Sequence, residues 1–362
     1  MIHRIPQIMA STTRTVFKPK AATGFGLMGM TWCDPQYHTP DAQAFEAMKT
    51  AIAHGATFWS SADYYGKPEP SLGLQLIRRY FKAYPEDASK VTLFIKGCVD
   101  FKTMNPKVSR EEVLASAEAV IKHLDGAKKI DIFGPARRNP EVPLEETLGA
   151  LKELVDAGKI GAVGLSEVGA ESIEKANSIY PLSLVEVEFS LFTTDLLHNG
   201  VADTARRLGI PIVAYSPQGR GFLTDSIKSL DDIPEGDIRR RFERFSPENF
   251  PKNLELVEKV KAVASKKGVK PGQLALAWIR ANGRPKKLTP EQKAAGVVLS
   301  EDDQKELTFI PIPGSTKPKN VTENSTVVEI TEEEKAELDD ILKTIPVHGG
   351  RYNKHLEWMC WQ

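Results

Sequence analysis

The most constraining feature of this chain is a regular alternation between short β-prone runs and longer amphipathic stretches. Short runs of apolar, β-branched and aromatic residues between turn-forming residues are typical of strands. Because these runs are mostly apolar, they indicate strands that are buried on both faces, as in a parallel sheet. Eight runs fit this description: residues 24–29, 57–61, 92–97, 130–134, 162–166, 184–190, 211–216 and 309–314.

The stretches between these runs carry helix patterns. Residues 42–55 end on a glycine, which is common just after a helix. Residues 109–126 begin with Ser109 and place Glu112 three residues later, which is the signature of a capping box. Residues 143–159 begin with a proline and repeat apolar residues at helical spacing, and residues 272–283 carry another helix pattern.

Eight such units predict one α/β domain, a (β/α)₈ TIM barrel of closed parallel strands. An open, doubly wound sheet is the structural alternative. That fold usually carries a glycine-rich dinucleotide fingerprint directly after its first strand, followed by a helix. Residues 24–29 contain glycines without that spacing, and no helix pattern follows them directly. The sequence therefore favours the barrel.

The barrel is expected to span residues 23–345 of the 362-residue chain. An N-terminal leader of residues 1–22 precedes it, and a C-terminal tail of residues 346–362 follows it. The leader is basic, and we interpret it as an ordinary leader, with a transit peptide as the alternative. Two polar segments, about 224–251 and 283–308, interrupt the alternation and are expected to be insertions on the barrel rim.

The charge balance and the cysteine content exclude several classes of protein. Lys plus Arg and Asp plus Glu both number 48, so we expect neither a nucleic-acid partner nor an anionic membrane surface. No apolar run approaches the ~18 residues that a membrane span needs. The three cysteines, Cys33, Cys98 and Cys360, are too sparse for a disulfide framework or a zinc site. We therefore expect no metal and a cytoplasmic location.

Two polar side chains stand at the ends of neighbouring expected strands. Tyr65 follows the second run at a glycine turn, and Lys96 lies inside the third. A lysine in an apolar strand is costly to bury unless a partner compensates its charge, although it could instead extend to solvent at the strand tip. A nearby ammonium lowers the pKa of a phenol, which can then give its proton to a developing alkoxide. Hydride addition to a carbonyl needs such a proton.

Around these two residues the chain resembles the aldo-keto reductases, from about residue 24 to residue 341. Within that family it looks most like the fungal pyridoxal reductases. Seven motifs carry the resemblance, and the three at 185–192, 214–224 and 312–324 are highly specific as a set. The motifs are "GLMGMTW" (26–32), "SSADYYG" (60–66), "FIKG" (94–97), "GKIGAVGLSE" (158–167), "VEVEFSLF" (185–192), "AYSPQGRGFLT" (214–224) and "IPGSTKPKNVTEN" (312–324).

The resemblance implies a (β/α)₈ barrel that binds NADPH without a dinucleotide fingerprint. It implies Tyr65 as the proton donor and Lys96 as its charge partner. Ser166 and the amide position that Glu186 occupies would contact the nicotinamide carboxamide, and Tyr215 would lie under the nicotinamide ring. The pyrophosphate loop would comprise Ser216, Pro217, Gly219, Gly221 and Leu223, and the adenosine segment Ser315, Thr316, Lys317, Asn320, Glu323 and Asn324.

The sequence departs from the family pattern at two positions of the usual catalytic tetrad. Ser60 stands where the family keeps an aspartate, and Ala136 where it keeps a histidine. Asp63 lies only two residues before Tyr65, and its direction should differ, so we do not expect it to replace that aspartate. Without the aspartate, one compensating negative charge is absent, and the pKa of Tyr65 is expected to fall further. How the site compensates for both losses is left open by the sequence.

The coenzyme and substrate sides also carry expectations. Carboxylates at Glu167 and Glu186 replace the usual amides, which leaves Ser166 as the donor to the carboxamide carbonyl. Lys317 could supply a charge to the 2′-phosphate, so NADPH is favoured over NADH, unless that lysine is simply solvated. Trp32 and Tyr64 are expected to wall the pocket of a small-molecule carbonyl substrate.

Three functions stay open from the sequence. The leading one is NADPH-dependent reduction of an aldehyde or ketone to an alcohol, with pyridoxal as a candidate substrate. The second is an NADPH-binding regulatory or interaction protein with weak catalysis, which the two missing tetrad residues motivate. The third is a reductase of larger xenobiotic or secondary-metabolite carbonyls, for which the two long insertions would line a bigger pocket.

Overall fold

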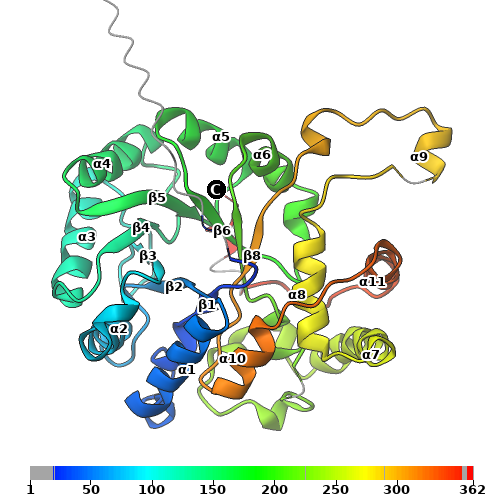
Figure 1. Cartoon of the computed structure of the whole chain (residues 1–362), viewed down its shortest axis with the longest axis horizontal. Helices are drawn as coiled ribbons and strands as arrows, with labels where there is room; N and C mark the ends of the chain where they lie inside the picture. The colour runs from blue at the N-terminus through cyan, green and yellow to red at the C-terminus, as the bar shows by residue number, and fades with distance from the viewer. Residues whose placement is uncertain (1–18, 20, 225, 289, 353–356, 362) are drawn as a thin grey trace, which may run out of the picture.

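The computed structural model describes residues 19, 21–224, 226–288, 290–352 and 357–361. Eight parallel strands follow one another around a single sheet in chain order, and helices surround them (Figure 1). Most of the expected leader, residues 1–18 and 20, lies outside the described residues. The strands are β1 (Phe25–Gly26), β2 (Phe58–Ala62), β3 (Thr92–Gly97), β4 (Ile130–Pro135), β5 (Ile160–Ser166), β6 (Leu184–Glu188), β7 (Ile212–Tyr215) and β8 (Phe309–Pro311).

The sheet closes on itself between β8 and β1. A parallel bridge joins Gly26 to Gly314, and the Gly24 amide donates to the Pro311 carbonyl at 2.9 Å. A side chain at Gly26 would place its Cβ 2.8 Å from the Ile312 carbonyl oxygen, so the closure requires glycine there. The predicted (β/α)₈ barrel is confirmed, and the doubly wound alternative is excluded.

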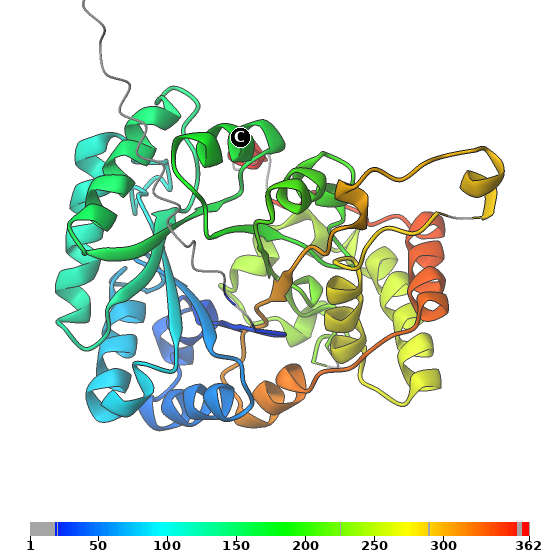
Figure 2. The same ribbon diagram turned by 45° about the horizontal axis from the view of Figure 1, so that its top comes forward.

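Helices cover the outside of the barrel, and Figure 2 shows them wrapped around its circumference. The predicted capping box is present: Ser109 accepts from the Glu112 amide, and Glu112 accepts from the Ser109 amide. The helices are α1 (Asp41–Ala53), α2 (Leu72–Ala83), α3 (Arg110–Leu124), α4 (Leu144–Asp156), α5 (Ala170–Ile179), α6 (Val201–Leu208), α7 (Phe250–Lys267), α8 (Pro271–Ala281), α9 (Pro290–Ala294), α10 (Pro318–Ser325) and α11 (Glu332–Thr344).

The first and last strands are shorter than the sequence predicts. The run at 24–29 pairs only over Phe25–Gly26, because the chain then turns into a 3₁₀ helix at Met28–Met30. The run at 309–314 pairs over Phe309–Pro311. Prolines at 311 and 313 have no N–H to donate, which limits the ladder of hydrogen bonds around β8.

The two-residue period of the strands sorts the interior of the barrel into layers. A lower layer is apolar and comprises Phe58, Phe94, Ile132, Leu184, Val213 and Ile310. Two residues further along β2, β3, β6 and β7, toward the carboxyl ends, the residues are polar, and Ser166 at the end of β5 pairs with Glu186 at the same level. This upper layer contains Ser60, Lys96, Ser166, Glu186 and Tyr215. Since active sites of such barrels lie at the carboxyl ends of the strands, the upper layer is the floor of the candidate site.

The two insertions differ in their relation to the barrel. Residues 224–251 form a series of 3₁₀ turns and the start of α7, and several of them line the cavity described below. Residues 283–308 carry α9 away from the body of the protein (Figure 1). None of its described residues lines that cavity. The expectation that both insertions would enlarge the pocket is therefore wrong for the second one.

The described part of the C-terminal tail packs against the mouth of the barrel. Arg351 is 8% exposed, and Tyr352 and Met359 line the cavity. Cys33, Cys98 and Cys360 are free thiols. Within the described part of the chain, none of the helices combines the length and the apolar character that a bilayer crossing requires.

Candidate active site

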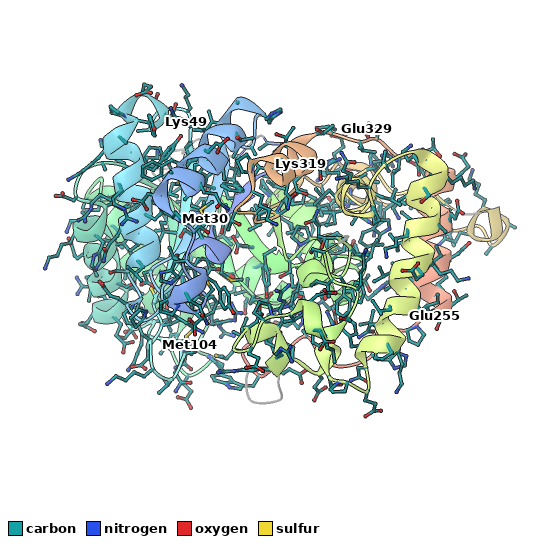
Figure 3. The ribbon with its side chains drawn as sticks, turned by 90° about the horizontal axis from the view of Figure 1, so that it is seen from below. Met30, Lys49, Met104, Glu255, Lys319 and Glu329 are labelled. Carbon is teal, nitrogen blue, oxygen red and sulfur yellow. The ribbon has the colours of Figure 1, made fainter. Side chains whose placement is uncertain are left out.

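A cavity of about 1090 Å³ opens at the carboxyl ends of the strands. Figure 3 labels Met104, on the loop after β3, and Lys319, on α10; both of these well-separated elements contribute to the lining. The cavity gathers most of the site residues that the sequence predicts. They are Trp32, Tyr64, Tyr65, Lys96, Ser166, Glu186, Tyr215, Ser216, Pro217, Gly221, Ser315, Lys317, Asn320, Glu323 and Asn324.

Three predicted residues do not line this cavity. Leu223 is fully buried in the core between the strands and helices, so its side chain supports the loop from behind. Gly219 has a positive φ and lies against Phe192, where a Cβ would come within 2.8 Å of the ring. The Thr316 carbonyl accepts from Gln43 on α1 at 2.7 Å. These three residues shape the loops around the cavity.

Tyr65 and Lys96 lie next to each other at the floor of the cavity. The Lys96 Nζ is 5.5 Å from the centroid of the Tyr65 ring. Lys96 is 2% exposed and Tyr65 is 9% exposed. The lysine therefore does not extend to solvent, and its charge must be compensated inside the protein.

Glu186 supplies the compensating charge from across the barrel. Its Oε1 lies 2.7 Å from the Lys96 Nζ. The same ammonium donates to the Ser60 Oγ at 2.6 Å, and the Ser60 hydroxyl donates to the Glu186 Oε2 at 2.6 Å. All three side chains are about 2% exposed. The carboxylate that is missing at position 60 is thus replaced by one on β6, with Ser60 filling the space between.

This geometry changes two expectations for the site. Both oxygens of Glu186 already contact Lys96 and Ser60, whereas its contact with a nicotinamide carboxamide stays a prediction. The lowered pKa of Tyr65 was predicted on the premise that no carboxylate balances the lysine, and that premise is wrong. Burial, and then the charge of Glu186, raise the pKa of Tyr65 above the ordinary value of a phenol.

Aromatic rings surround the Tyr65 phenol. Trp32 stacks on Tyr65, with ring centroids 5.4 Å apart and planes inclined by 21°. Tyr64 meets both rings edge-on, at 5.6 Å from Trp32 and 5.1 Å from Tyr65. Ala136 packs in the same cluster and is 1% exposed. This wall holds the phenol in one orientation and provides flat apolar surface for a planar substrate.

Asp63 faces away from this wall. Its Oδ2 accepts from the Ser116 hydroxyl of α3 at 2.9 Å, and its Oδ1 has no partner. Burial raises the pKa of Asp63 to about 7, against hydrogen bonds that lower it. As the sequence predicts, this residue does not replace the missing aspartate.

The raised pKa of Asp63 predicts how stability depends on pH. Between about pH 4 and pH 7 the folded state keeps the proton that the unfolded state loses, so stability should fall as pH rises through this window. We expect Asp63→Asn to flatten the decline, which is on the order of 4 kcal/mol. Urea unfolding at pH 4.5 and pH 7.5 measures it, and an equal pH dependence in both proteins would contradict this assignment.

A buried ionic cluster ties the C-terminal tail to the strand ends. Arg351 contacts the Glu167 Oε1 at 2.7 Å and the Glu188 Oε2 at 3.2 Å. Arg220 adds a second contact to Glu188 at 3.0 Å, and Arg244 lies 4.0 Å from it. Burial raises the pKa of Glu188, but the charges of the three arginines outweigh it and lower the pKa to about 2. Both glutamates are therefore ionised and hold the tail in place.

The same cluster fixes Tyr215 at the floor of the cavity. The Tyr215 hydroxyl lies 2.8 Å from the Tyr352 hydroxyl and accepts from the Arg351 Nη2 at 3.2 Å. These two contacts hold the Tyr215 hydroxyl against the tail. Glu167 is fully buried below this contact and does not line the cavity. The sequence predicts that Glu167 lies beside the nicotinamide carboxamide. In the structure its side chain contacts Arg351 instead.

The opposite end of the cavity suits an extended anionic dinucleotide. Lys317 is exposed at the N-terminus of α10, where free amides and the helix dipole favour a phosphate. The Ser315 Oγ accepts from the Lys317 amide at 3.1 Å and faces the same space. Asn324 accepts from Gln218 at 2.8 Å, which joins α10 to the loop after β7. The residues present here fit NADPH.

Glu323 has a further partner on the coenzyme side. Lys270, at the start of α8, forms an ion pair with it at 2.5 Å. Both residues line the cavity, so the pair spans the gap between α8 and α10. Across the described residues, no three His, Cys, Asp or Glu side chains are grouped so that they could hold a metal ion.

A closed (β/α)₈ barrel with a tyrosine and a charge-paired lysine at its strand ends defines a carbonyl-reducing oxidoreductase. The chain matches the model of the Aldo/keto reductase family over residues 23–343, and it belongs to that family. It is 38% identical over 340 residues to "Probable pyridoxal reductase 2" of Schizosaccharomyces pombe, covering 92% of this chain and 95% of that protein. The predicted family membership, and the likeness to a fungal pyridoxal reductase, are confirmed.

A second relative agrees with this assignment, and a solved structure agrees with the fold. The chain is 35% identical over 342 residues to "Aldo-keto reductase yakc [NADP(+)]" of Schizosaccharomyces pombe, covering 91% of each chain. The structure superposes on the glycerol dehydrogenase AKR11B4 from Gluconobacter oxydans with a TM-score of 0.70. The sequence identity to that structure is 20%, covering 91% of this chain and 93% of the other, so this likeness supports the fold alone.

Sequence reasoning missed the residues that come from the tail. Arg351 and Tyr352 carry no local motif, and they reach Tyr215 over more than one hundred residues of chain. The one available signal was the pair of glutamates in the apolar strand "LVEVE", since buried acids require buried cations.

Proposed function

We propose that this protein is an NADPH-dependent reductase that converts an aldehyde to an alcohol, with pyridoxal as its candidate substrate. The single observation that carries the proposal is the buried Lys96–Glu186–Ser60 network beside Tyr65, at the floor of a cavity of about 1090 Å³. NADPH supplies the hydride when it is bound. The roles of the chain's own residues in this proposal are described next.

Tyr65 donates the proton to the carbonyl oxygen as that oxygen becomes an alkoxide. A phenol with a raised pKa stays protonated at neutral pH, which a donor must be before the reaction. The alkoxide is more basic than the phenolate that remains, so the transfer is favourable. Lys96 stabilises that phenolate as it forms, because its ammonium lies 5.5 Å from the ring centroid.

Glu186 and Ser60 position Lys96 in this proposal. Two hydrogen-bonding partners hold the ammonium at 2.6 and 2.7 Å, which fixes its direction toward the tyrosine. Glu186 also keeps the buried network neutral while Tyr65 is protonated. When the phenolate forms, Lys96 interacts with two anions, the Glu186 carboxylate and the Tyr65 phenolate. The pKa of Tyr65 therefore depends on how strongly Lys96 interacts with each of them.

The substrate end of the cavity favours a planar aromatic aldehyde. The stacked rings of Trp32 and Tyr65 and the edge of Tyr64 provide one wall, and Tyr352 of the tail provides another. The likeness to a relative named "Probable pyridoxal reductase 2" supports a substrate of this shape. A cytoplasmic location is part of the proposal, supported by the three free thiols.

Two observations bear on the other functions. Residues of the first insertion, among them Ile238 and Phe242, line the cavity, which keeps larger carbonyl substrates as the second candidate. Family membership and the intact charge pair favour an enzyme over a regulatory protein.

The proposed function is tested by following the oxidation of NADPH by absorbance, with pyridoxal and a panel of aromatic and aliphatic aldehydes. Quenching of tryptophan fluorescence by NADPH without oxidation in the presence of any aldehyde would contradict the proposal.

The preference for NADPH is expected to depend on Lys317. Replacing it by Met removes a point charge from the N-terminus of α10, where the 2′-phosphate would bind. Because this lysine is exposed, we expect a loss of NADPH affinity of roughly three- to tenfold, with NADH affinity unchanged. Fluorescence titration with both coenzymes measures it. Lys319→Met, in the same helix but outside the cavity lining, is the matched control.

A further inference from the structure

Arg137 differs from Arg220, Arg244 and Arg351, which also lie at the mouth of the barrel, in forming no direct ion pair with a carboxylate. Arg220, Arg244 and Arg351 all contact Glu188, and Arg351 also contacts Glu167. Among the described residues, no carboxylate oxygen lies within 4.0 Å of the Arg137 guanidinium. Its two hydrogen bonds go to neutral oxygens: Nη1 donates to the Ala136 carbonyl at 2.6 Å, and Nη2 donates to the Tyr352 hydroxyl at 3.2 Å.

The position of Arg137 places this charge beside the reactive phenol. The preceding residue, Ala136, packs directly in the cluster of Tyr64 and Tyr65. The charge of Arg137 lowers the pKa of both phenols, against the larger effect of burial that raises it. Arg137, both tyrosines and Tyr352 line the same cavity. A guanidinium thus lies between the tail and the wall on which a planar substrate would stack.

A half-buried guanidinium with unused N–H groups is an incomplete site. Burying such a charge is costly unless an anion or several acceptors compensate it. The charge of Glu167 acts on the guanidinium without direct contact, and the only direct hydrogen-bond partners among the described residues are the two neutral oxygens. An anionic oxygen on the substrate would complete the set and would form charge-assisted hydrogen bonds. The neighbouring aromatic rings restrict the body of that substrate to a flat shape.

We propose that Arg137 is the subsite for an anionic oxygen carried by an aromatic aldehyde substrate, which it orients with its carbonyl toward Tyr65. This inference rests on the proposed function and deepens it by naming the substrate class. The anionic oxygen has three possible sources: a ring phenolate beside the aldehyde, a ring carboxylate, or a phosphate on a short arm. Pyridoxal belongs to the first group, because its ring carries an acidic hydroxyl next to the aldehyde.

The kinetic test compares wild type and Arg137→Gln on matched aldehydes. Benzaldehyde and pyridine-4-carbaldehyde are the neutral references. Pyridoxal and 2-hydroxy-5-nitrobenzaldehyde carry a phenolate, 2-carboxybenzaldehyde carries a carboxylate, and pyridoxal 5′-phosphate carries a phosphate. We expect kcat/KM for at least one anionic class to fall by about 10- to 100-fold, as for loss of a charge-assisted hydrogen bond. The neutral references should change by less than about threefold, and the class that is affected identifies the source.

A binding measurement separates this inference from the proposed function. Salicylate and its neutral counterpart salicyl alcohol are not reducible, and Trp32 in the cavity wall provides a fluorescence signal. Wild type should bind salicylate more tightly than salicyl alcohol, and Arg137→Gln should lose that difference. This result is independent of turnover, so it stands or falls separately from NADPH oxidation.

Matched variants exclude a structural explanation. Arg138→Gln removes an equal charge one residue away, outside the cavity lining, and should retain wild-type selectivity. Arg137→Lys should restore part of the selectivity. An equal loss on neutral and anionic aldehydes would show that Arg137 acts on the carbonyl or on folding, and that result would overturn the proposal. Equal binding of salicylate and salicyl alcohol by the wild type, together with no selective loss of kcat/KM for any anionic aldehyde in Arg137→Gln, would overturn it as well.

Discussion

Tyr65→Phe is expected to lower kcat for aldehyde reduction by about 10²- to 10⁴-fold, because it removes the proton donor and leaves the ring in place. The ring stacks on Trp32 through its faces, so the shape of the wall is retained. NADPH affinity, measured by fluorescence titration, should stay within about twofold of wild type. Stopped-flow measurement of NADPH oxidation determines whether the loss lies in the chemical step.

A control for this variant is available on the outside of the barrel. Tyr84→Phe removes a hydroxyl from a half-buried ring that packs beside Lys49, away from the cavity. It should retain wild-type turnover and stability. If Tyr65→Phe turned over at a rate close to that of Tyr84→Phe, Tyr65 would not be the donor, and another acid in the cavity would have to be sought.

The second large effect is expected at Lys96. Lys96→Met removes the cation from a buried pair and leaves the charge of Glu186 with Ser60 alone. Breaking a buried pair in this way costs about 3–5 kcal/mol of folding stability, because one charge stays uncompensated. We therefore expect a large loss of stability in urea unfolding, together with loss of turnover, since nothing then stabilises the Tyr65 phenolate.

A double variant separates the two consequences. Adding Glu186→Gln to Lys96→Met removes the stranded charge and should recover most of the lost stability while turnover stays low. The two substitutions should therefore be strongly non-additive in stability, as expected for residues in direct contact. Additive losses would show that Glu186 and Lys96 do not act as a pair. That outcome would also remove the carboxylate's proposed role in holding the lysine.

The layered interior explains why much of the fold and part of the site could be predicted. Strands with a two-residue period place Ser60 and Lys96 on the inside whenever Phe58 and Phe94 are inside. The position of Tyr65 follows from the turn after β2. These inferences need only the pattern of a single strand, and the sequence displays such patterns directly.

The partners of these residues could not be predicted in the same way. Glu186 reaches Lys96 from a strand on the other side of the barrel. Because the two residues are far apart in the sequence, no short motif of fixed spacing links them. The resemblance instead assigned Glu186 to the carboxamide. Arg351 arrives from the tail, where neither periodicity nor a motif marks it. Such contacts depend on closure of the whole barrel, which a single sequence does not display.

The pair of Lys96 and Glu186 also has a consequence for how the barrel assembles. Lys96 belongs to β3, in the first four strands, and Glu186 belongs to β6, in the last four. A half-barrel formed from either set would enclose one ion without its counter-ion, which disfavours it as a stable product. The residues that support the chemistry therefore destabilise partly folded forms. The Lys96–Glu186 ion pair can form only after the two halves of the barrel have come together.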